Sequence, residues 1–467
     1  MKRKSAPALL RAGMIAALSA ALLAGCATFR PAEPDAVVEV PLEWSRVSVD
    51  EALWPEADWW RGFGSGELDA LIERARESSP DLAAAWERIL QAEARARIAG
   101  ASLLPELDFA ADAGRSGAIG GGAGSIFGLS LGAAYEVDLW GRNSADRAAA
   151  RALVAASVHD QETVALTLSA GVADVYLQIL SLRERIAVAR LNLEVAEGVL
   201  RLVEVRERFG SASPLDLAQQ RAAVAQQRAG IPALEQQERE ARAALALLLG
   251  ETPQGFDVAA PGLTGMAVPE VAPGLPAELL QRRPDIRRAE MELIAAEADI
   301  AIARSALYPS LRLTGSLGLR SDELSTLFDG DPLWSVASAL AMPIFNSGRL
   351  AANRDLAESR HRELLHGYRA AILAAFADVD TVLADLEALQ EQARWQTEAR
   401  REAETALSLA ETRYRAGAAD LLAVLDAQRT LYQARDSEVQ LRAERLRAQV
   451  ALFRALGGGW GGGRGSM

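Results

Sequence analysis

Few residues in this chain could act as nucleophiles or metal ligands. Its 467 residues include one Cys and three His, and His361 and His366 are five positions apart, off the i, i+4 face that a helical metal site would use. The glycine-rich run at 120–124 falls between two strand-like segments, which indicates a surface loop and not a phosphate-binding loop. No activated serine or paired His/Asp arrangement is evident. We expect no enzymatic activity and no metal site.

The single cysteine lies in a segment with the layout of a secretory signal. A basic Lys-Arg-Lys cluster precedes an Ala/Leu-rich core that ends in Leu-Ala-Gly-Cys at Cys26. This string resembles a bacterial lipobox, and Ala27 resembles the outer-membrane sorting pattern. We predict a lipoprotein signal at 1–25 and a lipidated extended segment at 26–62, with the covalent lipid on Cys26 as the only attached group. The alternative is that Cys26 is a small residue near an ordinary cleavage site.

The charge balance excludes one class of partner. There are 63 acidic and 50 basic side chains, a formal net charge of −13. Proteins that coat phosphate backbones need clustered Lys and Arg, so we expect no nucleic acid partner. Outside the N-terminus, charges interrupt the apolar stretches, so no membrane-spanning helix is expected either.

The sequence indicates an internal repeat, with two copies of one pattern. Pro80 and Pro105 are 25 residues apart, as are Pro284 and Pro309, and each pair encloses an Ala/Arg/Glu-rich helical stretch. The alternative is chance similarity between Ala-rich helices, but prolines, glycines and strand-like segments recur in the same order. The predicted parts are a first repeat at 63–250, a linker at 251–276, a second repeat at 277–457 and a glycine-rich tail at 458–467.

Each repeat contains two segments in which apolar residues alternate with small or polar ones. These strands are predicted at about 106–116, 125–140, 309–320 and 332–345. The alternation suits either a soluble sandwich or a barrel with lipid outside and water inside. Four strands cannot close a barrel, because the smallest bacterial barrels have about eight, and hydrocarbon does not tolerate open edges. Strands that span lipid would therefore be shared between subunits, and three copies would supply 12.

The remaining sequence has helical periodicity over unusual lengths. Helices are predicted at 142–209, 214–249, 349–416 and 420–456. The longest of them would extend about 100 Å at 1.5 Å per residue. A kinked bundle or a coiled coil is the alternative, but the many small side chains favour helices packed side by side into a tube.

Four strings together resemble one family, the TolC-like outer-membrane channel proteins, in its lipoprotein branch of NodT-like or OprM-like efflux channels. They are Tyr-Glu-Val-Asp-Leu-Trp-Gly-Arg at 135–142, Arg-Pro-Asp-Ile-Arg at 283–287, Pro-Ile-Phe at 343–345 with Gly-Arg at 348–349, and Leu-Asp-Ala-Gln-Arg at 425–429. The resemblance implies an α+β membrane protein of Gram-negative bacteria. Its homotrimer would form a 12-stranded β-barrel in outer-membrane lipid, continued by a 12-helix barrel in the periplasm.

The resemblance also implies a passive function. The chain would conduct small molecules outward for a resistance-nodulation-division (RND) inner-membrane transporter and a periplasmic adaptor, which would dock at the helix turns at Gly210 and Gly417. A type I protein-secretion duct and a structural lipoprotein that bridges the envelope are the alternatives. For Trp59 and Trp60, the resemblance implies packing against the helical tunnel instead of an interfacial aromatic belt.

Three residues after the second turn share one helix face at spacings of four and three: Leu422, Asp426 and Arg429. By the resemblance, Leu422 and Asp426 would form apolar and acidic rings at the periplasmic aperture, with Arg429 in nearby polar contacts. Some relatives carry a second Asp where this chain has Ala423, so we expect fewer acidic rings. The alternative is that Leu422 packs in the core and that Asp426 and Arg429 are solvated helical neighbours.

Overall fold

A computed structural model describes residues 38–41, 44, 56–269, 274 and 276–458. The predicted signal and Cys26 lie outside the described residues. The chain forms two compact units. In their described parts, the strand unit lies within Trp86–His159 and Ile286–Ala371, and the helix unit lies within Val38–Ala85, Asp160–Asp285 and Ile372–Met467.

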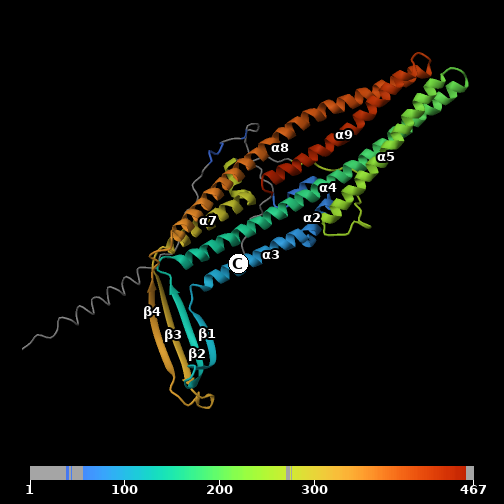
Figure 1. Ribbon diagram of the computed structural model, residues 1–467. Helices are drawn as coiled ribbons and strands as arrows, with labels where there is room; N and C mark the ends of the chain where they lie inside the picture. Colours follow the sequence, from blue (N-terminus) through green and yellow to red (C-terminus); the bar gives the residue numbers. More distant parts are fainter. Residues whose placement is uncertain (1–37, 42–43, 45–55, 270–273, 275, 459–467) are drawn as a thin grey trace, which may run out of the picture. The chain divides into compact units, whose positions relative to one another are not determined.

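The strand unit contains an antiparallel sheet in the order β1-β2-β3-β4 (Figure 1). Its strands are β1 Glu106–Gly117, β2 Ala123–Val137, β3 Ser310–Ser321 and β4 Leu333–Ala341. Two of them end before their predicted limits of 140 and 345. Strand β2 stops because the Asp138 carboxylate accepts hydrogen bonds from the backbone N–H groups of Asn143 (3.0 Å) and Ser144 (2.9 Å) and so caps the next helix. Strand β4 stops before Pro343, which has no N–H to donate.

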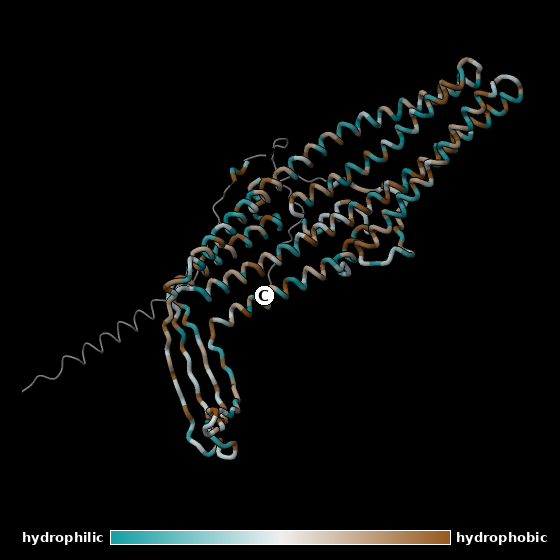
Figure 2. The backbone as a smooth tube through the Cα atoms, in the orientation of Figure 1, coloured by the Kyte–Doolittle hydropathy of each residue, from teal (hydrophilic) through white to brown (hydrophobic). Residues whose placement is uncertain are grey.

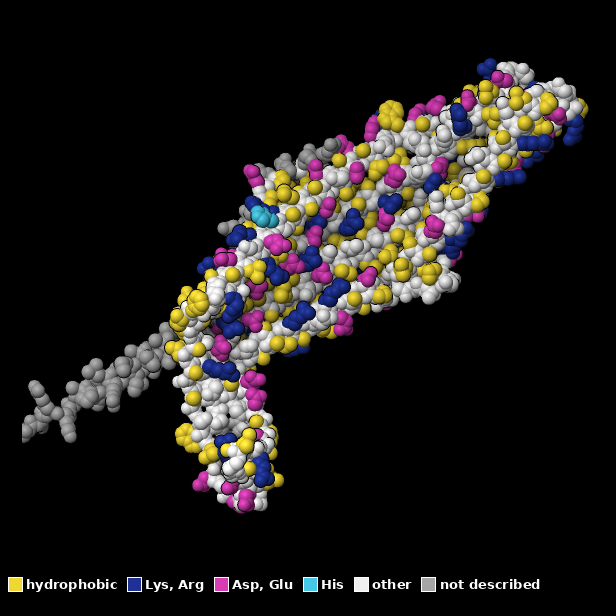
Figure 3. Space-filling view, viewed as in Figure 1, with side chains coloured by type: hydrophobic (Ala, Val, Ile, Leu, Met, Phe, Trp, Pro, Cys, Tyr) yellow, Lys and Arg dark blue, Asp and Glu magenta, His cyan; other side chains and the backbone are white. Residues whose placement is uncertain are grey.

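The sheet has one apolar and one small or polar face. One row of directly opposed residues contains Phe109, Leu131, Leu317 and Trp334. The neighbouring row, on the other face, contains Asp108, Gly132, Ser316 and Ser335. The register therefore brings the alternating patterns of all four strands into phase. In Figure 3 the visible middle of the sheet carries few charged side chains, whereas acidic and basic side chains are interspersed over the helices.

The helices of the two halves match in length. The first half contains η1 Trp59–Phe63, α2 Gly66–Ser78, α3 Pro80–Ala101, α4 Arg142–Arg208 and α5 Pro214–Leu248. The second contains α6 Pro276–Arg282, α7 Pro284–Ser305, η2 Leu324–Thr326, α8 Arg349–Arg415 and α9 Leu421–Ala455. Both α4 and α8 have 67 residues, both α5 and α9 have 35, and both α3 and α7 have 22.

Helix α4 differs from the expectation that charged residues interrupt every long apolar stretch. Helix α4 contains an 18-residue window with a mean hydropathy of 1.5, long and apolar enough to cross a membrane by length and composition, although half of that window is buried inside the structure. Figure 2 shows hydrophobic and hydrophilic residues alternating along the long helices. This pattern is typical of helices with one packed face.

An aromatic cluster forms the centre of the helix unit. Trp59 and Trp60 are each 5% exposed, and the Trp59 ring stacks on Phe453 of α9 with centroids 4.8 Å apart. Phe63 is fully buried beside them. Both tryptophans thus pack against the long helices, as the resemblance implied, and do not form an exposed belt.

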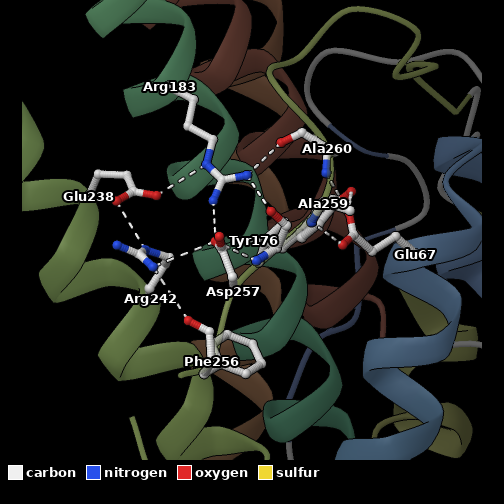
Figure 4. A network of polar contacts seen from close by, with 10 residues as sticks. Glu67, Tyr176, Arg183, Glu238, Arg242, Phe256, Asp257, Ala259 and Ala260 are labelled. Carbon is white, nitrogen blue, oxygen red and sulfur yellow. Dashed lines mark hydrogen bonds and ion pairs between the residues drawn. The ribbon is translucent and has the colours of Figure 1, made fainter. Parts of the chain in front are cut away.

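A network of ion pairs and hydrogen bonds holds linker residues 257–260 against helices α4 and α5 (Figure 4). Arg183 of α4 pairs with Glu238 of α5 (3.1 Å) and with Asp257 of the linker (2.5 Å). It also donates to the backbone carbonyls of Val258 and Ala260. The hydrogen bond from the Val258 N–H, helped by Arg183, lowers the pKa of the Asp257 carboxyl. The linker residues from Asp257 to Ala260 are therefore held against α4 and α5.

Candidate aperture at the helix tips

Both long hairpins reverse direction through the same glycine motif. Gly210 and Gly417 adopt positive φ values of 74° and 73°, which glycine reaches without a Cβ penalty. The next N–H groups, of Ser211 and Ala418, each donate 2.8 Å hydrogen bonds back across the turn to the preceding helix. This is the Schellman arrangement, which satisfies the last carbonyls of a helix. The two predicted tip residues thus end α4 and α8, at one end of the helix unit (Figure 1).

An arginine four residues before each glycine reinforces the turn. Arg206 donates to the Ser211 carbonyl (3.4 Å), and Arg413 donates to the Ala418 carbonyl (3.5 Å). Among the described residues, only Arg206 makes a second side-chain contact: its guanidinium lies 4.4 Å from the centre of the Tyr414 ring and donates to the Tyr414 carbonyl. Arg206 therefore joins the two hairpins. Sequence reasoning missed this residue, although the recurring Arg-x-x-x-Gly pattern pointed to it.

The three predicted aperture residues form an exposed stripe at the start of α9. Leu422 is 58% exposed, and the side chains of Asp426 and Arg429 are 62% and 71% exposed. The Arg429 Nη2 atom lies 2.9 Å from Asp426 Oδ1. The alternative that Leu422 packs in the core of the subunit is wrong, because its side chain faces away from the chain. Asp426 and Arg429 are solvated helical neighbours, as the same alternative held.

The opposite face of α9 is buried and contains unusual polar groups. Val424 and Leu431 pack with residues of α4, α5 and α8 in one apolar cluster. Gln428 lies on the same face and is 2% exposed, with no hydrogen-bond partner for either amide atom among the described residues. The Tyr432 hydroxyl likewise has no partner in the described chain, and burial raises its pKa. The stripe with Leu422 is therefore held in place by a packed face behind it.

The described residues at the tip offer charge and an exposed apolar side chain. Among the described residues, no group of three or more His, Cys, Asp or Glu side chains could hold a metal ion. Tyr414 is buried, and desolvation raises its pKa, so its phenol stays protonated at neutral pH. What the tip offers is an exposed stripe of one apolar, one acidic and one basic residue.

Comparison with known proteins gives a consistent result. A sequence profile of the outer membrane efflux protein family matches residues 71–251 and 275–458. The chain is 46% identical over 456 residues to the pyoverdine export outer membrane protein OpmQ of Pseudomonas aeruginosa, a match covering 95% of this chain and 96% of OpmQ. It is 31% identical over 451 residues to the probable outer membrane lipoprotein SilC of Salmonella typhimurium, covering 94% and 97%.

Solved structures agree. The open state of the MtrE outer membrane channel of Neisseria gonorrhoeae superimposes with a TM-score of 0.82 at 31% identity, over 92% of this chain and 98% of MtrE.

Proposed function

The chain belongs to the outer membrane efflux protein family, and from that premise we propose that three copies close a single channel across the outer membrane and the periplasm. As a family member it is an outer-membrane component of an efflux system and a non-enzymatic conduit. The trimer, the barrel, the aperture and the internal duplication are what we propose in addition to family membership.

One observation carries the proposal: a two-faced sheet that is open at both edges. Strands β1 and β4 each pair on one side only within the described chain. The apolar face suits lipid, and the small polar face suits water. Unpaired strand edges are not tolerated in hydrocarbon, so β1 of one copy would pair with β4 of the next. Three copies give 12 strands, an even number within the bacterial range.

The long helices would form the periplasmic part of the same channel. Each 67-residue helix is about 100 Å long at 1.5 Å per residue, more than a compact domain requires. The matched lengths of the two halves support an internal duplication. Repeated three times, the helices would line a tunnel below the barrel.

The exposed stripe at the start of α9 would close the far end of this tunnel. Threefold symmetry would turn Leu422 into an apolar ring and Asp426 into an acidic ring. Arg429 would reduce the repulsion within the acidic ring, because it already pairs with Asp426. The aperture would then favour cations only weakly when closed.

A lipid on Cys26 would anchor each copy to the membrane. Cys26 lies outside the described residues, and its support is the Leu-Ala-Gly-Cys string together with the likeness to SilC, which is named a probable lipoprotein. The other partners would be a periplasmic adaptor, docking at the turns of Gly210 and Gly417, and an inner-membrane RND transporter that supplies the energy. OpmQ is named for pyoverdine export, so pyoverdine is the first cargo to test for this chain.

Planar-bilayer recording with the purified, full-length protein tests the proposal. A trimeric channel conducts ions across the bilayer without nucleotide. A structural lipoprotein passes no current, and that result would overturn the proposed function. Co-purification distinguishes the remaining alternative, because an RND transporter supports efflux and an ATP-driven transporter supports a type I duct.

A further inference from the structure

The small-residue face of the sheet carries one row in which opposite charges flank a glycine. Asp112 of β1 lies directly opposite Gly128 of β2, and Gly128 lies directly opposite Arg320 of β3. Directly opposed residues share a face, so both charges stand on the face that also carries Ser316 and Ser335. Their Cα atoms are about 10 Å apart, because neighbouring strands are about 4.8 Å apart.

The glycine determines where the acidic group lies. A Cβ atom placed on Gly128 would be 2.6 Å from Asp112 Oδ1 and 2.9 Å from Oδ2, distances that real Cβ atoms do not show. The Asp112 carboxylate therefore lies over the Gly128 backbone, on the side of β1 that faces Arg320. Gly128 is buried although Asp112 and Arg320 are exposed. Because Gly128 has no side chain, the Asp112 carboxylate has space to extend over strand β2.

The row lies in the half of the sheet that is far from the helices. Arg320 is the second-last residue of β3, and Asp112 is five residues before the end of β1. Between this row and the helices, the same face presents small side chains such as Ser130 and Thr314, and it also carries charged ones: Glu106, Asp108, and the directly opposed Glu136 and Arg312. A solute that moves along this face away from the helices passes those charges first and reaches Asp112 and Arg320 in the far half of the sheet.

We propose that Asp112 and Arg320 form a charge-balanced ring inside the outer end of the barrel and that this ring determines which ions pass there. The inference rests on the proposed function, because threefold repetition of the row requires the shared barrel. Three carboxylates and three guanidinium groups cancel in net charge but alternate around the lumen. Such a ring admits anions and cations alike, whereas a ring of one sign would exclude ions of that sign.

The neighbouring residue Arg115 provides a matched control. It lies three positions after Asp112 and therefore on the opposite face, opposed to Ser125 of β2. It has the same charge as Arg320 and lies in the same half of the sheet. If the small-residue face lines the lumen, Arg115 is outside the barrel wall and has no effect on ion selectivity.

The test measures reversal potentials across a KCl gradient in planar bilayers for the full-length protein and four variants. Salt of about 30 mM keeps the screening length well above its value of about 8 Å at physiological ionic strength. Arg320→Ala should raise the potassium-to-chloride permeability ratio about two-fold, and Asp112→Ala should lower it about two-fold. The double variant Asp112→Ala/Arg320→Ala should return to the wild-type ratio, and Arg115→Ala should not change it.

The outcomes distinguish failure of the proposed charge ring from failure of the proposed channel. Normal currents with an unchanged ratio in both single variants would overturn the ring and leave the channel standing. A shift in Arg115→Ala equal to that expected for Arg320→Ala would show that the other face lines the lumen and would also overturn the ring. No current from the wild-type protein would overturn the proposed function and the ring with it. If an alanine variant does not assemble, the near-isosteric Asp112→Asn and Arg320→Gln variants give the same test.

Discussion

Replacing Arg206 with alanine should loosen the contact between the two hairpin tips. Arg206 of α4 stacks on the Tyr414 ring at 4.4 Å and donates to the Tyr414 carbonyl at the end of α8. A hydrogen bond from a charged group contributes about 1.5–3 kcal/mol, and an exposed cation–π contact about 0.5–1 kcal/mol. Because the side chain is only half-buried, we take the lower end, about 2 kcal/mol. That corresponds to about a 30-fold change in the equilibrium between joined and separated tips.

Arg413 is the matched control for this change. It occupies the same place before the second glycine, but within the described part of the chain its side chain makes only the cap contact with the Ala418 carbonyl, at 3.5 Å. That contact is longer than an ordinary hydrogen bond, so Arg413→Ala should change the equilibrium by less than about three-fold. The two variants remove the same side chain from equivalent turns. Their difference isolates the contact with Tyr414.

Hydrogen–deuterium exchange of the tip amides measures the effect directly. Arg206→Ala should lower protection at 206–214 and 412–421 by about ten-fold or more, and it should raise the mean current in planar bilayers. Arg413→Ala should do neither. Equal effects of the two variants, or unchanged protection in Arg206→Ala, would refute the reasoning that Arg206 joins the hairpins.

The other predictions concern the aperture, the anchor and the core. Asp426→Ala should raise single-channel conductance or weaken block by trivalent cations, and unchanged values for both would remove Asp426 from the aperture. Cys26→Ala should abolish lipid processing and change membrane fractionation, whereas wild-type behaviour in both assays would show an ordinary cleavage site. Tyr176→Phe should lower stability by about 2 kcal/mol, because the buried hydroxyl donates to Glu67 (3.1 Å) and also contacts Ser65 (3.0 Å). Tyr432→Phe should not lower stability, because its hydroxyl has no partner in the described chain; thermal unfolding of the two variants in detergent compares them, and an equal loss would contradict the assignment.

Local sequence patterns were sufficient to predict the four strands and the four long helices. Alternation of apolar and small residues located the four strands, and helical periodicity located α4, α5, α8 and α9, because each pattern gathers apolar residues on one side of its element. The helix ends at Gly210 and Gly417 followed from glycine's freedom to adopt positive φ. The strand ends were less accurate. They depend on single groups, such as the Asp138 carboxylate, whose partners are not specified by periodicity.

Contacts between distant segments could not be predicted in this way. The register of β2 against β3 joins residues almost 200 positions apart, so the position of Arg320 opposite Gly128 appears only in the folded sheet. The same holds for Arg206 and Tyr414 at the tips. The predicted stripe of Leu422 and Asp426 was placed on a helix face by spacing alone, but its exposure depends on which side of α9 packs against the other helices.

The central claim is that the pore exists only in the assembly, since one chain supplies four strands with two unpaired edges. Mass measurement of detergent-solubilised fractions, combined with bilayer recording of each fraction, tests it most directly. We predict that the fraction with three copies conducts ions and that any fraction with a single copy is silent. A stable single copy that conducts would contradict the account.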